Sequence, residues 1–456
     1  MTKNDKPIIK LFTEHSHYYV YDTYFNTILE INQLQYKELI SVCRIGVESY
    51  LSLSKESKEY HDVCMLIRKG FLKTNIIDRV ENHLSQYIGQ LLDSSVNDLV
   101  LQVTKDCNFK CRYCGFANST GIDRNHEQIN MSWDIAKKSI DFLYQHSRDA
   151  QQVSIAFYGG EPLLNFQLVK NATEYANNLF KSKKILYRMT TNASLLTDDV
   201  IEFLVQNKFH ISLSIDGPEK IQNIHRSFRV NGKGTFSVVY ENLLKIKNRH
   251  QNYLESHVKV MPVIVDGEDH NEVLEYFYDI GFKRNQITML NAELSGIDFR
   301  AEVCDYHSDE MKIKNVALID AANKMDSVYQ NKQCLPKVWH HGGTCIPGVK
   351  RLFVDTDGMF FPCEKILLRD NLSIGNLKSG FNLEIIKNMA NIGKMTEERC
   401  KKCWAMRFCE ICVSQCNDIE KCELTAKQKE FTCKAQEAKA LWYLKHRIMA
   451  TKGCES

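Results

Sequence analysis

Three closely spaced cysteines are the first residues of this sequence that suggest chemistry. Cys107, Cys111 and Cys114 follow one another as C-x3-C-x2-C in the stretch TKDCNFKCRYCGF. Three thiolates on one short loop can hold three irons of a cubane [4Fe–4S] cluster, which four cysteines ordinarily close. The fourth iron is then open to a small molecule. A zinc loop completed by a distant histidine or cysteine is the alternative, and the spacing favours iron–sulfur over zinc.

A second and larger concentration of cysteines lies near the end of the chain. Eleven of the 17 cysteines fall within the last 123 residues. After Cys334, they form a C-x12-G-x4-C unit around Gly358 and a C-x2-C-x5-C-x2-C unit, followed by four more. Paired C-x2-C units also suit a zinc ribbon, but that interpretation leaves Cys345, Cys363 and Cys433 without a role. The eleven are Cys334, Cys345, Cys363, Cys400, Cys403, Cys409, Cys412, Cys416, Cys422, Cys433 and Cys454.

Polar turns follow three apolar runs between these cysteine groups. Paired glycines in YGGEP let a ligand approach the backbone, and the carboxylate beside them can accept hydrogen bonds from an ammonium group. The turn TTN offers polar groups suited to a ribose or adenine, and SIDGP is followed by an arginine. Each turn alone reads as a helix cap, but together they predict a site. The residues concerned are Gly159, Gly160, Glu161, Thr191, Asn192, Ser214 and Arg226.

These turns must be positioned by alternating strands and helices. Six strand-like runs alternate with five helical patterns, which indicates βαβ units and a parallel sheet. The sheet is either doubly wound or an open α/β barrel, and in both the site lies at the carboxyl ends of the strands. The strands are expected at 98–104, 152–158, 185–191, 210–215, 257–263 and 286–290, and the helices near 131–146, 165–181, 197–207, 236–249 and 270–280.

Length, charge and cysteine usage limit the class of protein. A chain of 456 residues predicts two or three domains, and a net charge of +3 gives no basic field for nucleic acid. The N-terminus carries charges and no secretory signal, and no run approaches the length of a membrane span. We therefore expect a cytoplasmic protein without membrane or nucleic-acid partners. In that reducing compartment, cysteine clusters indicate metal or redox chemistry rather than disulfides.

The motifs CNFKCRYC, YGGEP, TTNAS and SIDGP resemble the radical S-adenosylmethionine (SAM) superfamily across roughly residues 98–295. The resemblance implies a partial (β/α)6 barrel whose open iron chelates the amino and carboxylate groups of SAM. Gly159, Gly160 and Glu161 would meet the methionine amino group. Ser214 and Arg226 would be further SAM contacts, with Arg229 a near neighbour. Reductive cleavage of SAM would give a 5′-deoxyadenosyl radical that abstracts a substrate hydrogen, while the protein positions the reactants and excludes water.

The C-terminal cysteine order is similar to the SPASM domain, which holds two auxiliary [4Fe–4S] clusters. The sequence departs from the family pattern by one residue, because Val413 stands where a cysteine is expected. Either Cys412 or Cys416 can be the ligand instead, and we favour Cys412. The resemblance implies that cluster I uses Cys345, Cys363 and Cys412, with Cys334 a candidate fourth ligand and otherwise an open iron for a substrate thiolate. Cluster II would use Cys400, Cys403, Cys409 and Cys433, with Cys422 in reserve.

Residues 11–70 resemble the winged-helix-like leader-recognition element of ribosomal-peptide maturases, which would bind a leader peptide as an added β-strand. The alternative is a module that only packs on the barrel. The predicted function is formation of thioether cross-links in a Cys-containing precursor peptide, with electrons from flavodoxin or ferredoxin. A sulfatase-type maturase making formylglycine, a carbon–carbon cross-linking enzyme and a non-catalytic metal-binding module are the alternatives. The acceptor carbon and the general base are not predicted.

Four cysteines and one histidine pair lie outside the motifs above. Cys43 and Cys64 are expected to be small buried hydrophobes, Cys454 to be free, and Cys304 to have a minor chance of facing substrate. The pair His340-His341 is expected to be structural or solvated.

The chain is thus expected to divide into four segments. These are 1–90 for leader recognition, 91–300 for the barrel, 301–335 as a helical linker and 336–456 for the SPASM domain with a C-terminal helix.

Overall fold

The computed structural model describes residues 5–114, 126–265, 270–292, 334–341, 345–418 and 420–452. The predicted linker 301–335 therefore lies almost wholly outside the described residues, as do Cys304 and Cys454. Within the described ranges, no helix combines the length and the apolar character that crossing a bilayer requires.

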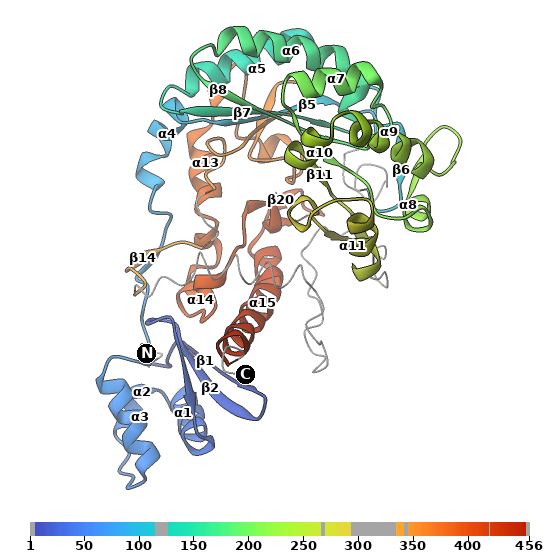
Figure 1. Cartoon of the computed structure of the whole chain (residues 1–456). Coiled ribbons are helices and arrows are strands. Elements are labelled where there is room, and N and C mark those ends of the chain that lie inside the picture. Colours follow the sequence, from blue (N-terminus) through green and yellow to red (C-terminus); the bar gives the residue numbers. More distant parts are fainter. Residues whose placement is uncertain are drawn as a thin grey trace.

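The N-terminal module is a three-stranded antiparallel sheet with helices on one face (Figure 1). The first helix begins at a capping box, in which Asn32 and Gln35 satisfy each other's backbone N–H groups. Val20 of the central strand packs with Leu39 and Val63 of the helices. The elements are β1 (Ile9–Glu14), β2 (His17–Asp22), β3 (Thr27–Ile31), α1 (Gln33–Ile45), α2 (Val47–Leu51) and α3 (Lys58–Arg68).

The middle of the chain is an open α/β barrel. Its strands run parallel in the order β11-β9-β8-β7-β5, and helices cover the outer face. The strands are β5 (Asp98–Thr104), β7 (Gln152–Gly159), β8 (Lys184–Thr191), β9 (His210–Leu213) and β11 (Val258–Val260). The helices are α5 (Trp133–His146), α6 (Phe166–Leu179), α7 (Asp198–Gln206), α8 (Glu219–His225), α9 (Phe236–Arg249), α10 (Gln251–His257) and α11 (His270–Asp279).

The last part of the barrel differs from the sequence prediction. The expected strand 257–263 is divided, because α10 occupies its first residue and β11 ends at Val260. After Met261 and Pro262 the chain resumes as β12 (Val263–Val265), which pairs in parallel with β13 (Leu290–Ala292). The sixth strand therefore begins four residues later than the expected 286–290.

The C-terminal region extends the barrel sheet. Strand β15 (Leu352–Val354) pairs in parallel with β5, so the barrel edge is covered rather than open to other chains. Three antiparallel strands follow in the same sheet. The further elements are β16 (Met359–Phe361), β17 (Gly375–Asn376), β18 (Gly380–Phe381), α13 (Leu383–Ala390), α14 (Glu397–Lys401), β19 (Asn417–Asp418), β20 (Glu423–Leu424) and α15 (Ala426–Lys452).

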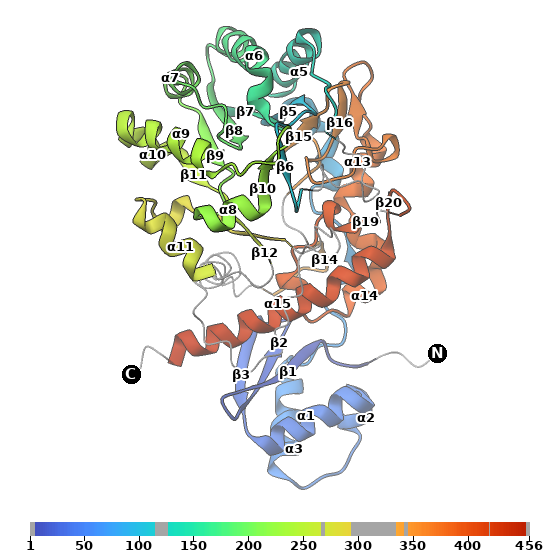
Figure 2. The same cartoon turned by 90° about the vertical axis from the view of Figure 1, so that its right-hand side faces the viewer.

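Helix α15 lies between the barrel and the N-terminal module (Figure 2). Phe12 and Tyr21 of the small sheet share a core with Phe408 and with Tyr443 of α15. The Arg407 guanidinium donates to the backbone carbonyls of residues 23 and 24, at 2.9 Å each. The N-terminal module is therefore packed against the C-terminal region on the face that its own helices leave uncovered.

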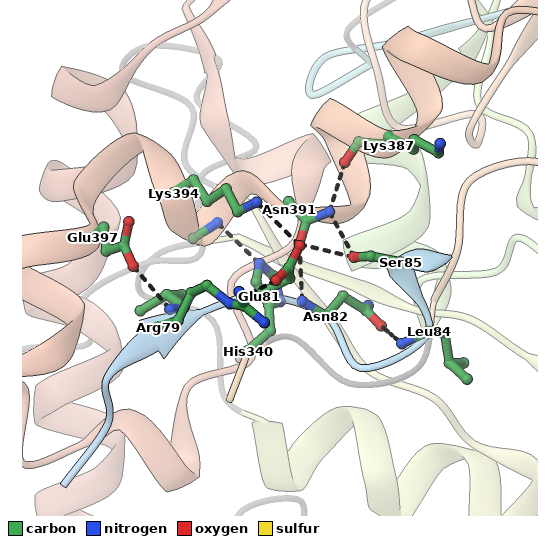
Figure 3. A network of polar contacts seen from close by, with 12 residues as sticks. Arg79, Glu81, Asn82, Leu84, Ser85, His340, Lys387, Asn391, Lys394 and Glu397 are labelled. Atoms are coloured by element: carbon green, nitrogen blue, oxygen red, sulfur yellow. Dashed lines mark hydrogen bonds and ion pairs between the residues drawn. The ribbon is translucent and has the colours of Figure 1, made fainter. Parts of the chain in front are cut away.

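The segment that joins the N-terminal module to the barrel is also held by the C-terminal region (Figure 3). It contains β4 (Arg79–Val80), which pairs with β14 (Val338–Trp339), and α4 (Ile88–Ser94). The Asn391 side chain accepts from the backbone N–H of Asn82 at 2.8 Å and donates to Ser85 Oγ at 2.9 Å. Glu397 Oε1 accepts from the backbone N–H of Val80 at 3.0 Å. This joining segment is thus held to the C-terminal region by strand pairing and by side-chain hydrogen bonds.

Candidate active site

The first cysteine group lies on the loop that follows β5, at the carboxyl end of the barrel. Cys107 and Cys111 are buried, and Cys111 belongs to β6 (Phe109–Cys111), which pairs with β10 (Arg226–Phe228). Burial raises the thiol pKa of Cys107 and of Cys111 to about 12, and neighbouring thiolates add to the effect. Buried thiols that oppose one another's ionisation fit a cluster, because iron supplies the positive charge that thiolates need.

The paired glycines of YGGEP pack directly against this cysteine loop. A Cβ on Gly160 would lie 2.2 Å from the carbonyl oxygen of Asp106 and 3.0 Å from Cys107 Cβ. A Cβ on Gly159 would lie 2.3 Å from the carbonyl oxygen of Thr104. The sequence suggested that these glycines make room for a ligand. In the structure, they make room for the backbone that carries the first cysteine.

Glu161 joins the ends of β7 and β8. Its carboxylate accepts from Thr191 Oγ1 at 2.7 Å and from the backbone N–H of Asn192 at 2.7 Å. Burial raises its pKa to about 7, although these hydrogen bonds and one from the backbone of Leu163 favour the charged form. The Asn192 side chain donates to Asn108 Oδ1 at 2.8 Å, beside Cys107. Glu161, Thr191 and Asn192 are therefore brought together at the cysteine loop.

Arg226 is held by a buried carboxylate that the sequence analysis did not assign. Its Nε and Nη2 each donate to Asp216 at 2.9 Å, and Tyr113 Oη donates to the same carboxylate at 2.5 Å. The relative exposure of Asp216 is 0% and that of Arg226 is 6%. The Coulomb attraction of Asp216 offsets the cost of burial and holds the pKa of Arg226 well above its usual value. Ser214 lies nearby, where its backbone N–H donates to the carbonyl oxygen of Thr191 at 2.9 Å.

A cavity of about 1060 Å³ connects these residues with the C-terminal region. The three cysteines, Gly159, Gly160, Thr191, Asn192, Ser214 and Arg226 all line it. Its other walls include Glu364 and Lys365, which follow Cys363, and Gln415, which follows Cys412. The cavity therefore extends from the first cysteine loop toward the C-terminal cysteines.

The C-terminal cysteines fall into two groups. In group I, consisting of Cys345, Cys363 and Cys412, burial raises the thiol pKa of Cys345 and of Cys363, and the Cys412 thiolate adds to both shifts. In group II, consisting of Cys400, Cys403, Cys409 and Cys433, burial raises the thiol pKa of Cys403 to about 12, with contributions from Cys400 and Cys433. The pKa of Cys409 is raised by burial, with contributions from Cys403 and Cys433. These groups are the two ligand sets that the sequence suggested, and their assignment as cluster ligands stays a prediction.

Three alternative ligands occupy different surroundings. Cys416 is fully buried beside Cys412, Cys433 and Cys400, between the two groups. Cys334 lies near the Tyr24 side chain of the N-terminal module and raises the pKa of that hydroxyl. Cys422 lies in the turn between β19 and β20 with φ +53°. In the described ranges, no three His, Cys, Asp or Glu side chains converge as a single metal ion requires, whereas a cubane distributes its ligands over separate irons.

The isolated cysteines and the histidine pair have structural surroundings. Cys64 is buried in the core of the N-terminal module and Cys43 packs against that core, as the sequence predicted. His340 Nε2 accepts from the backbone N–H of Gly393 at 2.9 Å, and burial lowers its pKa to about 4. His341 is also buried, with Nδ1 3.2 Å from the carbonyl oxygen of Ile411. Both histidines belong to the contact between the joining segment and the C-terminal region.

An open loop of three cysteines at the carboxyl end of an α/β barrel defines an iron–sulfur enzyme that binds a small cofactor. Comparison with family models gives the same class, because residues 101–279 match the Radical SAM superfamily. These residues have the radical SAM fold, and the protein is an enzyme with SAM and [4Fe–4S] clusters as its cofactors.

Individual relatives cover different shares of the chain. A cysteine-type anaerobic sulfatase-maturating enzyme of Clostridium perfringens is 24% identical over 359 residues, which cover 74% of this chain and 93% of that enzyme. An uncharacterized protein of Methanocaldococcus jannaschii is 32% identical over 176 residues, which cover 36% of this chain and 57% of that protein. The solved structure of native anSMEcpe with bound AdoMet and Kp18Cys peptide has the same fold, with a TM-score of 0.56, 21% identity and coverage of 78% of this chain and 98% of that one.

Proposed function

We propose that this enzyme modifies a Cys-containing precursor peptide by forming thioether cross-links. The cavity carries this proposal, because it joins the SAM-binding end of the barrel to the walls beside Cys363 and Cys412. A peptide in that space would have an acceptor carbon near the first site and a thiol near group I. Each cross-link replaces one C–H and one S–H bond by a C–S bond, so the peptide loses two hydrogens.

In this proposal, Cys107, Cys111 and Cys114 hold the radical SAM cluster, and groups I and II hold auxiliary clusters. When bound, the first cluster and SAM supply a 5′-deoxyadenosyl radical for hydrogen abstraction. The chain's own residues hold that site in place. Glu161 fastens the end of β7 to the end of β8, and the pair of Asp216 and Arg226 fixes β10 against Cys111.

The N-terminal module binds the leader peptide in this proposal. Strand β3 is an edge of its sheet, where an added strand can form backbone hydrogen bonds. The module also contacts the group II loop, because Ile8 and Ile76 share a core with Cys400. A bound leader would thus lie on a module that packs against the second auxiliary site.

Formylglycine formation is a second candidate, because the sulfatase-maturating enzyme aligns over 93% of its own length. That alignment covers 74% of this chain, so about a quarter of the chain has no counterpart in it. A module for a leader peptide accounts for such additional length. The two candidates differ in the mass change of the substrate, since formylglycine formation from cysteine replaces the sulfur by oxygen and also removes two hydrogens.

Co-expression with a short Cys-containing precursor peptide, followed by mass spectrometry, tests both functions. Loss of two hydrogens for each cross-linked cysteine supports thioether formation if alkylation shows that the thiols are consumed. Exchange of sulfur for oxygen together with the loss of two hydrogens would instead establish formylglycine formation. The Cys107→Ala variant should abolish both modification and SAM cleavage, whereas Cys43→Ala serves as a matched cysteine control. SAM cleavage that survives in Cys107→Ala would contradict the assignment of the site.

A further inference from the structure

A fully buried lysine lies among the group II cysteines. Lys429 is in the first turns of α15 and has a relative exposure of 0%. Its Nζ donates to Thr396 Oγ1 at 2.5 Å and to Cys400 Sγ at 3.3 Å. The positive charge also lowers the thiol pKa of Cys409 and of Cys433 against the larger effect of burial. The ammonium group therefore donates directly to one of the four group II sulfurs.

Lys429 differs from other lysines of the same helix. Lys439 and Lys445 are partly exposed and form ion pairs with Glu410 at 2.6 Å and with Glu14 at 2.8 Å. In the described part of the chain, the hydrogen-bond acceptors of Lys429 are one hydroxyl and one sulfur, and no carboxylate forms an ion pair with it. A buried ammonium without an opposite charge costs several kcal/mol. The thiols around it can supply that charge only when they are thiolates.

We propose that Lys429 is a positioning residue that compensates the charge of the second auxiliary cluster and raises its reduction potential. This inference rests on the proposed assignment of group II as cluster ligands. Four thiolates give a [4Fe–4S] centre a net negative charge, and reduction adds one more negative charge. A cation that hydrogen-bonds a ligand sulfur stabilises the reduced form more than the oxidised form.

The neighbouring groups agree with this role. Thr396 Oγ1 lies 3.4 Å from Cys400 Sγ, so the hydroxyl orients both the ammonium and the sulfur. Lys429 is thus a fully buried cation directed toward a group II sulfur, whereas Arg399, a second cation near Cys433, is partly exposed and paired with Glu437.

Redox titration of the anaerobically reconstituted full-length enzyme, followed by electron paramagnetic resonance, tests the proposal. In Lys429→Met, the second auxiliary cluster should be at least tenfold harder to reduce, which corresponds to about 59 mV for one electron. Lys429→Arg should retain most of the wild-type potential, and Lys439→Met should leave it unchanged. Equal potentials in Lys429→Met and Lys439→Met, at equal iron content, would overturn the proposal.

The thermal stability of the cluster-free protein provides a second measurement. Methionine fills a similar volume without a charge, so Lys429→Met should be at least as stable as the wild type when no thiolate is needed. A less stable or insoluble cluster-free variant would show that the ammonium group stabilises the fold in the absence of the cluster. That result would refute charge compensation of the cluster as the role of Lys429.

Iron analysis of Cys403→Ala tests the assignment of group II as cluster ligands separately from the role of Lys429. If the variant retains the iron content and the spectrum of the wild type, the group II assignment fails, and this inference fails with it. If the cluster is lost in Cys403→Ala but its potential in Lys429→Met is unchanged, only the role of Lys429 is wrong.

Discussion

Replacing Arg226 with methionine distinguishes a structural role from a cofactor contact. The substitution removes two hydrogen bonds of 2.9 Å to Asp216, a carboxylate with 0% exposure. The remaining donors to this carboxylate are the Tyr113 hydroxyl and the backbone N–H of Val263. Hydrogen bonds to charged groups contribute about 1.5–3 kcal/mol each. Breaking a buried ion pair at one partner costs about 3–5 kcal/mol. We expect a loss of that size in the unfolding free energy.

Thermal unfolding without SAM measures this effect. For a cooperative unit of roughly 200 residues, the loss corresponds to a decrease in Tm of about 6–20 °C. Arg229→Met is the matched control, because its ion pair with Asp106, at 2.6 Å, is partly exposed and contributes at most about 1 kcal/mol. Adding Asp216→Leu to Arg226→Met should recover part of the stability. If Arg226→Met unfolds at the same temperature as Arg229→Met and loses only SAM affinity, the ion pair of Asp216 and Arg226 does not hold this site together.

Three further outcomes are expected. Between about pH 4.5 and 7 the native state binds the Glu161 proton and the unfolded chain does not. The unfolding free energy should therefore fall by ~3 kcal/mol as the pH rises through this range. Denaturant titrations should show a flatter pH dependence of the unfolding free energy in Glu161→Gln. Gly393→Ala places a Cβ 2.5 Å from the joining segment and should cost about 1–3 kcal/mol, seen as faster proteolysis there, whereas Gly89→Ala, at 3.8 Å from its neighbour, should not. Cys412→Ala should lower bound iron more than Cys416→Ala, and the reverse order would reassign the ligand.

The central strands and most barrel helices could be predicted because their patterns are long and local. Strand β5 at 98–104 and helix α9 at 236–249 have the expected bounds. The prediction failed where the pattern was short or ambiguous. Strand β1 was missed, and the apolar run after residue 257 hid both the end of α10 and the break at Pro262. Short segments carry too little periodicity to separate helix from strand.

The cysteines of the site could be predicted from spacing, but their supporting residues could not. Asp216 resembles a turn residue until β10 brings Arg226 back to it. The ten-residue separation of Asp216 and Arg226 was the available signal. Lys429 lies in the lysine-rich stretch AKQKE, which is typical of a solvated helix face. Only tertiary packing places Thr396 and Cys400 beside it.

The shared core of the first and last segments has a consequence for protein synthesis. Tyr21 of the small sheet and Tyr443 of α15 are separated by more than 400 residues in the chain. At about 5–20 residues per second, roughly 20–80 s pass between their appearance on the ribosome. During that interval the aromatic face of the nascent N-terminal sheet has no partner. We expect the native N-terminal module to be completed last, although its residues are made first.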